Sequence, residues 1–489
     1  MKGRMITTIA PPIRAEQLFA EAARAAPERV ALLYGERTWT FASFYAESRR
    51  RARALRAALP PGAVVIAITP MSDDLLLAWL ACCHLGLTFC HLSPQYTTHE
   101  VAPLAARAAA RRILTSDGAP HPLLPDLPAL PLALPGGDDA GGGDAGADLP
   151  AVGTPEDPAV LATTSGTTGR LPKLAIVPHR ALTWRRDLPA WFEARPGVTA
   201  TTTRGFKSVL RQICIAAGQR LPLLIVSTLV PAKLERELAR AQTQFLTIQP
   251  AILRLLVDNP QPPPATLRLQ LVRAGAAPLP PTLAVAAAQR YGAMVTQVLS
   301  TTESGQILAR PEWGAPEGSV GLPNPGVAVR LVDTAGNAVP DGVQGEIIAR
   351  SPGLMHGYLD DPAATADALR DGWYWTGDLA VRDAEGYYFL RGRRSLRINV
   401  NGLKVAPEEV EEVLLAHPDI REAVVLGQPD ERHGERVRAI VCPVGAAPTT
   451  AELRRFCLER LAPYKVPQLW EYRDTLPRSP LGKVLRNQL

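Results

Sequence analysis

The sequence has few cysteines, and their spacing indicates neither a disulfide framework nor a metal-binding pair. Six cysteines occur in 489 residues, and no two have C-x-x-C spacing. The N-terminus lacks the apolar core of a signal peptide, and the most apolar stretch, residues 75–90, is too short to cross a membrane. We therefore expect a cytoplasmic protein without a membrane span, in which residues 75–90 form a buried helix followed by a strand.

The sequence also has little excess charge. Lys and Arg number 53 against 47 Asp and Glu, which leaves a formal charge of +6 for the whole chain. A nucleic-acid-binding protein concentrates far more positive charge on one face, so we expect no nucleic acid partner.

What the sequence does contain is enough apolar material for several cores. It is 46% hydrophobic and 20% charged, and its length predicts a multidomain globular chain. The 47 prolines and 38 glycines are concentrated partly in residues 121–158, where helical and strand periodicity both fail, so we expect a flexible segment there. Gly141, Gly143 and Gly146 match G-x-G-x-x-G, but neither a strand nor a helix flanks them, which argues against a dinucleotide site.

Apolar strand patterns and helical patterns alternate along most of the chain. Residues 62–69 form a β-branched run, and short strand-like runs that end in polar loops recur at residues 161–169, 223–230, 245–249, 269–275 and 293–300. This alternation predicts an α/β fold with layered, largely parallel sheets. From about residue 321 short strands and Gly/Asp turns predict a β-rich subdomain, and the last 95 or so residues predict a small α+β domain whose first helix begins at Pro407.

The segment from Thr163 to Lys173 is the most informative one. Its glycines let the backbone curve closely around a ligand, its hydroxyls can donate to phosphate oxygens, and Lys173 adds a positive charge. The segment is not a Walker A loop, because Lys173 follows Pro172 and is not followed by Ser or Thr. An anion-binding loop and a plain polar turn are both compatible with this segment taken alone.

Together with further motifs, this segment resembles the adenylate-forming superfamily, which includes acyl-CoA synthetases, nonribosomal-peptide adenylation domains and luciferases. The motifs occur in the family's order over some three hundred residues: 163–173, 274–279, 300–303, 345–347, 374–379, 392–393 with Gly402, and 477–486. The resemblance implies an N-terminal AMP-binding domain over residues 1–394 and a small mobile lid domain over residues 395–489, with a hinge at Ser395.

The resemblance also implies roles for individual residues. It assigns the nucleotide to Thr164, Ser165, Gly166, Thr167, Thr168, Gly169, Lys173, Gly275, Ala276, Ala277, Pro278, Leu299, Ser300, Thr301, Asp378 and Arg393. It assigns catalysis to Thr302, Glu303 and Lys483, with Glu303 as the ligand of Mg²⁺.

Three of these roles have a physical basis of their own. The Asp378 carboxylate can accept hydrogen bonds from two vicinal ribose hydroxyls, although a simple Gly-Asp turn would have the same sequence. Glu303 offers the oxygen ligands that Mg²⁺ prefers, and its alternative is a solvated surface carboxylate. Lys483 can stabilise the charge that builds on phosphate oxygens, and its alternative is an ordinary exposed lysine.

The resemblance places the acid substrate near Phe206, Lys207, Arg211, Ala274 and Gly305, and a passage for a thiol near Gly402 and Lys404. Relatives that activate amino acids have an Asp near the position of Lys207, so we expect no α-amino acid substrate. Lys207 or Arg211 would pair with a polar or anionic substituent of the acid, or else both are solvated charges on a helix face.

Some positions differ from the family pattern. The phosphate loop carries one extra residue before Pro172, and Leu174 replaces a usual glycine. Leu299 and Ser300 replace an aromatic residue and a glycine, which removes a stacking contribution of about 1 kcal/mol and predicts modest ATP affinity. Ser395 replaces a charged residue at the hinge, which leaves the energetics of domain movement open.

The implied function is ATP- and Mg²⁺-dependent activation of a small acyl or aryl acid as an acyl-adenylate, followed by transfer to coenzyme A or to the phosphopantetheine of a carrier protein. Alternatives are a nucleotide-binding scaffold with little turnover, an adenylating enzyme with a non-thiol acceptor, and an unrelated phosphate-loop NTPase that lacks its Gly-Lys-Ser/Thr signature. We expect a monomer or a homodimer.

Overall fold

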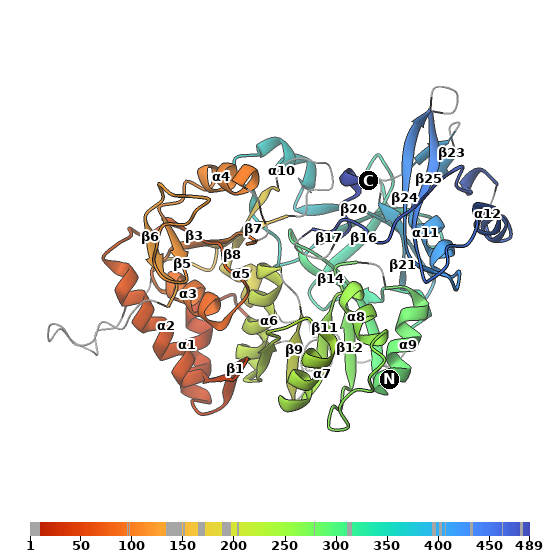
Figure 1. Cartoon of the computed structure of the whole chain (residues 1–489). Helices are drawn as coiled ribbons and strands as arrows, with labels where there is room; N and C mark the ends of the chain where they lie inside the picture. The colour runs from red at the N-terminus through yellow and green to blue at the C-terminus, as the bar shows by residue number, and fades with distance from the viewer. Residues whose placement is uncertain are drawn as a thin grey trace.

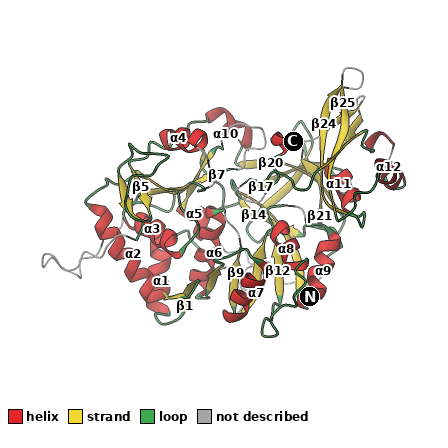
Figure 2. Ribbon diagram, viewed as in Figure 1, coloured by secondary structure: helices red, strands yellow, loops and turns green. Residues whose placement is uncertain are grey.

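The computed structural model describes residues 10–94, 96, 98–133, 149, 152–164, 172–187, 197–202, 205–277, 279–310, 315–393, 398–400, 403–405, 407–430, 434–461, 463–479 and 483–489. These residues form two large sheets with helices on their faces, a β-rich part, and a small C-terminal part (Figures 1 and 2). The mixed α/β class predicted from the sequence is confirmed.

The first large sheet has seven strands. Their order is β18 (Gly357–Tyr358), β8 (Leu174–Pro178), β7 (Pro158–Thr163), β4 (Thr88–His91), β3 (Val64–Ala67), β5 (Arg112–Thr115) and β6 (Ala129–Pro131). From β7 to β6 all neighbours are parallel, and β8 and β18 are added in antiparallel pairing. The strands are short apolar runs buried on both faces, as a parallel sheet covered by helices requires.

The second large sheet has nine strands. Their order is β15 (Leu322–Pro323), β14 (Gly305–Ala309), β13 (Met294–Thr301), β12 (Leu271–Ala274), β11 (Thr243–Ile248), β9 (Val198–Thr201), β10 (Leu223–Ile225), β1 (Val30–Tyr34) and β2 (Arg37–Thr40). The central strands from β13 to β1 are parallel, and β2, β14 and β15 are antiparallel. The predicted parallel character is confirmed for the centre of both sheets.

Helices lie between the two sheets and on their outer faces. One shared core joins both sheets to α1 (Ala15–Ala25), α2 (Phe41–Arg56), α3 (Asp73–His84), α5 (His179–Thr183) and α6 (Phe206–Gln219). The outer face of the nine-stranded sheet packs against α7 (Pro231–Arg240), α8 (Pro250–Val257) and α9 (Pro281–Tyr291), and the outer face of the seven-stranded sheet against α4 (Thr98–Arg107). Residues 75–90 form the predicted buried helix and strand, as α3 and β4.

Beyond residue 321 the chain forms the predicted β-rich part. It contains β16 (Ala328–Val332), β17 (Gly345–Arg350), β19 (Leu369–Arg370), β20 (Trp373–Arg382) and β21 (Tyr388–Arg393), all antiparallel, with α10 (Pro362–Ala368) before β19.

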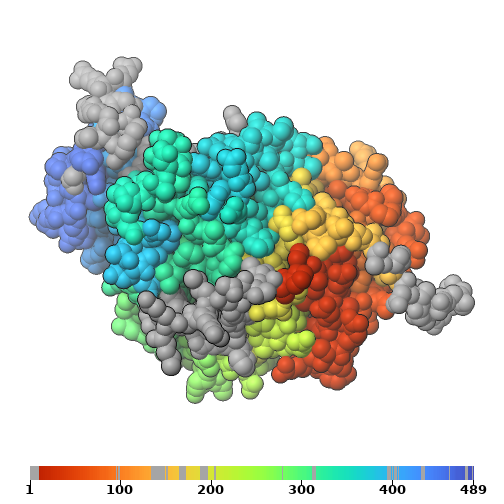
Figure 3. Space-filling view, turned by 180° about the vertical axis from the view of Figure 1, so that it is seen from behind, coloured from red at the N-terminus to blue at the C-terminus, as the bar shows by residue number. Residues whose placement is uncertain are grey.

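The C-terminal part has its own core. Strands β22 (Ile398–Val400), β23 (Leu403–Val405), β24 (Ile420–Asp430), β25 (Gly434–Pro443) and β26 (Leu469–Tyr472) form one sheet covered by α11 (Pro407–Leu415) and α12 (Thr450–Leu458). Short 3-10 turns span Pro463–Lys465 and Arg486–Gln488. In the view from behind, these residues (blue) form one end of the molecule beside the β-rich part, and the N-terminal residues (red) lie toward the other end (Figure 3).

Two predictions from the sequence concern residues 121–158 and the boundary between the two domains. Within residues 121–158 the structure has strand β6, which pairs with β5 and which was not predicted from the sequence, because three residues are too few to give a periodic pattern. Residues 134–148, 150 and 151 lie outside the described residues, so the flexible segment remains a prediction. The proposed boundary between residues 394 and 395 lies outside the described residues and remains a prediction. No helix among the described residues is long and apolar enough to cross a membrane.

Candidate active site

A hairpin of strands β7 and β8 frames the predicted phosphate loop. Thr163 pairs with Leu174 across the hairpin, and the Thr164 amide donates to the Lys173 carbonyl oxygen at 2.9 Å. The Lys173 ammonium lies 4.7 Å from the centre of the Tyr358 ring, a cation–π contact. The loop tip lies outside the described residues, and with it five predicted ligands: Ser165, Gly166, Thr167, Thr168 and Gly169.

The turn between β13 and β14 holds Glu303. Its side chain is 9% exposed, and one carboxylate oxygen accepts a hydrogen bond from the Tyr358 hydroxyl at 2.8 Å. The Met355 amide donates to the Glu303 carbonyl oxygen at 2.7 Å, and the Ser304 amide donates to the Thr301 hydroxyl oxygen at 3.0 Å. Glu303 is therefore not a solvated surface carboxylate, and its oxygens suit a hard cation such as Mg²⁺.

Lys207, at the start of α6, supports the same turn. Its side chain is 7% exposed, and its ammonium donates to the Thr302 carbonyl oxygen. Burial lowers the pKa of Lys207 to about 7, with Arg211 and Arg180 adding to the shift and Glu303 opposing it. The alternative of a solvated helix-face charge is therefore wrong for Lys207, because the apolar pattern of α6 buries this position while the carbonyl partner compensates the ammonium.

Asp378 lies on β20 directly after Gly377, whose φ of +73° produces a turn that glycine favours. The Nε of Arg393 on β21 donates to Oδ1 of Asp378 at 2.7 Å. Oδ2 is buried and has no hydrogen-bond partner within the part of the chain that the structure describes. Burial raises the pKa of Asp378, and the charges of Arg393 and Lys483 oppose the rise. An unpaired buried acceptor fits a hydroxyl-bearing ligand such as a ribose.

Lys483 reaches this site from the C-terminal part. It lies on the segment after β26, where its amide donates to the Ser479 hydroxyl oxygen at 3.2 Å. Burial lowers the pKa of the Lys483 ammonium, as does Arg393, while Glu303 and Asp378 oppose the shift. Lys483 is half-buried and therefore not an ordinary exposed lysine, and its charge interacts with those of Arg393, Glu303 and Asp378.

The segment after β12 forms the other side of the site. Gly275 approaches Val298 so closely that an added Cβ would meet Val298 Cγ2 at 3.0 Å, and Ala276 has the unusual φ of +71°. Leu299 packs against the core of the β-rich part, and its strand has a register shift between Leu299 and Ser300. Pro278 lies outside the described residues.

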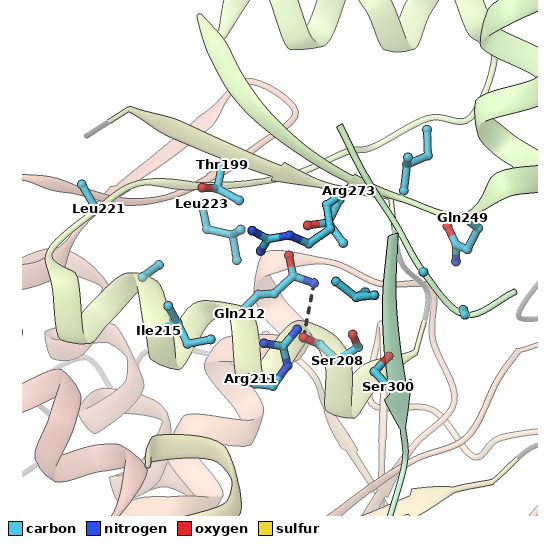
Figure 4. A pocket seen from close by; sticks show the side chains of 16 residues that line it. Thr199, Ser208, Arg211, Gln212, Ile215, Leu221, Leu223, Gln249, Arg273 and Ser300 are labelled. Carbon is cyan, nitrogen blue, oxygen red and sulfur yellow. Dashed lines mark hydrogen bonds between the residues drawn. The ribbon is translucent and has the colours of Figure 1, made fainter. Parts of the chain in front are cut away.

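A pocket with about 730 Å³ of empty space, part of it open to solvent, adjoins this segment. Gly275, Ala276 and Ser300 lie in its wall next to residues of α6 and of strands β9 to β13 (Figure 4). Of the five residues predicted for the acid, Arg211 lines this pocket. Phe206 packs instead against the rings of Phe89 and His91. The others are placed elsewhere: Ala274 is buried in β12, Gly305 begins β14, and Lys207 faces the turn.

The whole arrangement matches a known family. The sequence profile of the AMP-binding enzymes matches residues 19–359, and the profile of the C-terminal domain of AMP-binding enzymes matches residues 409–483. The chain belongs to the AMP-binding enzyme family. The resemblance to the adenylate-forming superfamily is thereby confirmed.

Three proteins illustrate the range of activities among those to which this chain is similar. The fatty acid–[acyl-carrier-protein] ligase ScoC of Streptomyces coeruleorubidus is 31% identical to this chain over 501 residues, covering 95% of this chain and 93% of that protein. The o-succinylbenzoate coenzyme A synthetase of Bacillus subtilis, solved with its acyl-adenylate intermediate, has a TM-score of 0.85 at 25% identity and covers 98% of each chain. The amide bond synthetase McbA of Marinactinospora thermotolerans has a TM-score of 0.86 at 28% identity, covering 97% of this chain and 98% of its own.

Three residues at the candidate site of this AMP-binding enzyme were not predicted from the sequence. Tyr358 holds Glu303, and Arg273 and Gln212 line the pocket. Arg273 stands out as a charge inside the apolar strand Leu271–Ala274, a signal that was present in the sequence. Tyr358 carried no such signal, because its partner lies 55 positions away.

Three predictions concern the hinge and the thiol passage. Ser395 and Gly402 lie outside the described residues, and for Lys404 the structure describes the backbone in β23 but not the side chain. Before the predicted hinge, an added Cβ on Gly392 would meet a Glu408 carboxylate oxygen at 2.3 Å, so β21 and α11 approach closely at this glycine.

Proposed function

We propose that this AMP-binding enzyme activates an acyl or aryl acid with ATP and then transfers the acyl group to a thiol. The observation that carries the proposal is the meeting of Glu303, Asp378 and Arg393 with Lys483, which comes from the C-terminal part. A carboxylate that could bind the ribose, beside a half-buried lysine and a candidate Mg²⁺ ligand, is an arrangement suited to chemistry at the α-phosphate of a nucleotide.

In the first half-reaction, a carboxylate oxygen of the acid attacks the α-phosphorus of ATP. The new O–P bond gives the acyl-adenylate, and the P–O bond to pyrophosphate breaks with its electron pair leaving on pyrophosphate. Asp378 would bind the ribose, Lys173 and the phosphate loop would bind the phosphates, and Lys483 would stabilise negative charge on the oxygens of the α-phosphate. Mg²⁺ bound by Glu303 would neutralise phosphate charge.

In the second half-reaction, a thiolate attacks the acyl carbonyl carbon and AMP leaves. The thiol would be coenzyme A or a carrier-protein phosphopantetheine. Relatives named as carrier-protein ligase and coenzyme A synthetase support both. A non-thiol acceptor is a second candidate, since the amide bond synthetase has the same fold over nearly its whole length.

Acid-dependent exchange between ATP and pyrophosphate tests the first half-reaction. We expect exchange with at least one acid of a broad panel and none without acid. Loss of this dependence, or full exchange by Lys483→Ala, would contradict the proposal. The acceptor follows from mass spectrometry of products formed with coenzyme A, a phosphopantetheinylated carrier protein, or a primary amine.

A further inference from the structure

The pocket beside Gly275 and Ala276 contains two arginines. Arg211 lies on α6 and Arg273 on β12, and both guanidinium groups point into the same part of the pocket as the Gln212 amide (Figure 4). The sixteen described residues that line the pocket include no Asp or Glu. Arg211 also donates to the Gln306 side-chain oxygen at 3.3 Å. The described lining thus contributes two positively charged side chains and no negatively charged one, a composition that suits an anionic group better than a cationic one.

Much of the rest of the wall is apolar. Apolar side chains come from Ile215, Leu221, Leu223, Ile248 and Val298. A ligand with an apolar body can therefore be buried here, while its charged end is held by the arginines.

Gln212 gives a second, independent sign of a polar ligand. Its side chain is 7% exposed, and its Nε2 donates to the Thr201 hydroxyl at 3.2 Å and to the Ser208 carbonyl oxygen at 3.4 Å. Its Oε1 is buried without a hydrogen-bond partner within the described ranges. Buried amide oxygens are rarely left unpaired, so a hydrogen-bond donor, such as a water that accompanies the ligand, would complete this site.

The position of the arginines along α6 relates the pocket to the reacting end. Lys207 contacts the turn of Thr302 and Glu303, and Arg211 follows it by four residues, about 6 Å further along the helix axis. An acid whose carboxylate lies at the turn would extend past Arg211 toward Arg273. The arginines would then meet the far end of the acid, not the carboxylate that is activated.

We propose that the acid substrate carries a second anionic group, such as a carboxylate, at the end remote from the activated carboxylate, and that Arg211 and Arg273 bind it. This inference rests on the proposed function and assigns it a substrate class: acids with an apolar spacer between two anionic ends.

The test compares matched pairs of acids. Pyrophosphate release would be measured with α,ω-dicarboxylates of four to ten carbons and with monocarboxylates of the same lengths, and with terephthalate against 4-methylbenzoate. For at least one length, the wild-type enzyme should have a kcat/KM about 10-fold or more higher for the diacid. Arg273→Leu and Arg211→Leu should each lower the diacid-to-monoacid ratio about 3-fold or more, toward equal use of the two acids.

Controls separate a binding role from a folding defect. Arg273→Lys keeps the charge and should keep part of the preference, and Arg236→Leu changes an exposed arginine on α7 and should leave the ratio unchanged. Thermal unfolding shows whether each variant is folded.

The outcomes are distinguishable. If monoacids are used as well as diacids in every pair, or if both leucine variants keep the wild-type ratio, this inference is wrong while the proposed function stands. If no acid of either series, and none of a broader panel of fatty and aromatic acids, supports pyrophosphate release, the proposed function is wrong, and this inference is wrong with it.

Discussion

The Arg393 guanidinium donates to one oxygen of Asp378 at 2.7 Å and leaves the other oxygen of that carboxylate buried and, among the described residues, unpaired. This hydrogen bond orients the carboxylate, because holding Oδ1 fixes the carboxylate plane and therefore the position of Oδ2. Burial of an unpaired acceptor costs about 1 to 3 kcal/mol, which a bound hydroxyl would recover. A ligand that places a hydroxyl group at Oδ2 would therefore stabilise this site.

Asp378→Ala should abolish recognition of the ribose hydroxyls. For the wild-type enzyme we expect kcat/KM to fall about 10-fold or more when 3′-deoxyATP replaces ATP, since a hydrogen bond to a charged group contributes about 1.5 to 3 kcal/mol. The variant should have a raised KM for ATP and the same kcat/KM for both nucleotides. Asp341→Ala, which removes a surface carboxylate paired with Arg382, is the control. Undiminished discrimination in Asp378→Ala would contradict the assignment.

Lys483→Ala should separate the two half-reactions. Removing a group that stabilises developing charge on phosphate oxygens typically costs about 100- to 1000-fold in rate, and we expect such a loss in pyrophosphate release. Transfer from chemically prepared acyl-adenylate should be retained, because that step breaks the acyl C–O bond and no bond to phosphorus forms or breaks, although AMP gains a negative charge as it leaves. Lys465→Ala is matched to it, since Lys465 also lies in the C-terminal part but pairs with Glu409 at 2.6 Å. Equal losses in both half-reactions would indicate a structural defect.

Tyr358→Phe removes the hydroxyl that donates to Glu303. A hydrogen bond to a charged group contributes about 1.5 to 3 kcal/mol, so kcat/KM for ATP should fall about 10-fold or more. The Mg²⁺ concentration for half-maximal rate should also rise, because Glu303 would no longer be held in place. Tyr472→Phe removes a hydroxyl bonded to the Pro448 carbonyl oxygen far from the site and is the control. An unchanged Mg²⁺ titration in Tyr358→Phe would rule out this positioning role.

The sequence was sufficient to predict the fold class because its signals are local. The run Val64–Ala67 and the helix Asp73–His84 are each readable from a few adjacent residues, and both are present in the structure. Strand β6 could not be predicted, because three residues without alternating apolar and polar side chains give no strand pattern. Only their pairing with β5 identifies them as a strand.

The candidate site could be predicted only in part, because the contacts between its residues are not local in the sequence. Motif order placed Glu303, Asp378 and Lys483 in one family of sites, but no motif could show that Lys207 turns toward the Thr302 carbonyl oxygen while Arg211 enters the pocket. The two residues are one helical turn apart, and only packing decides which neighbour each one meets. Arg273 joins Arg211 from a strand 62 positions later, a juxtaposition that only the fold creates.

Lys207 should make the stability of the protein depend on pH above neutrality. Its pKa is lowered by burial from the usual 10.5 to about 7. Between these values the unfolded chain binds a proton at this lysine that the folded protein does not, so the free energy of unfolding rises as the pH rises from about 7 toward 10.5. Below pH 7 the lysine is protonated in both states, and its contribution is constant and unfavourable.

Lys207→Met removes this proton linkage together with the hydrogen bond to Thr302. The lost bond lowers stability at every pH, whereas the lost linkage changes the slope. The free energy of unfolding of the wild type minus that of the variant should therefore increase between pH 7 and pH 9, by at most about 2 to 3 kcal/mol, and stay level between pH 6 and pH 7. Urea unfolding at four pH values measures the difference, with Lys233→Met on the exposed face of α7 as baseline. Parallel pH profiles for wild type and Lys207→Met would mean that the ammonium is not desolvated in the folded protein.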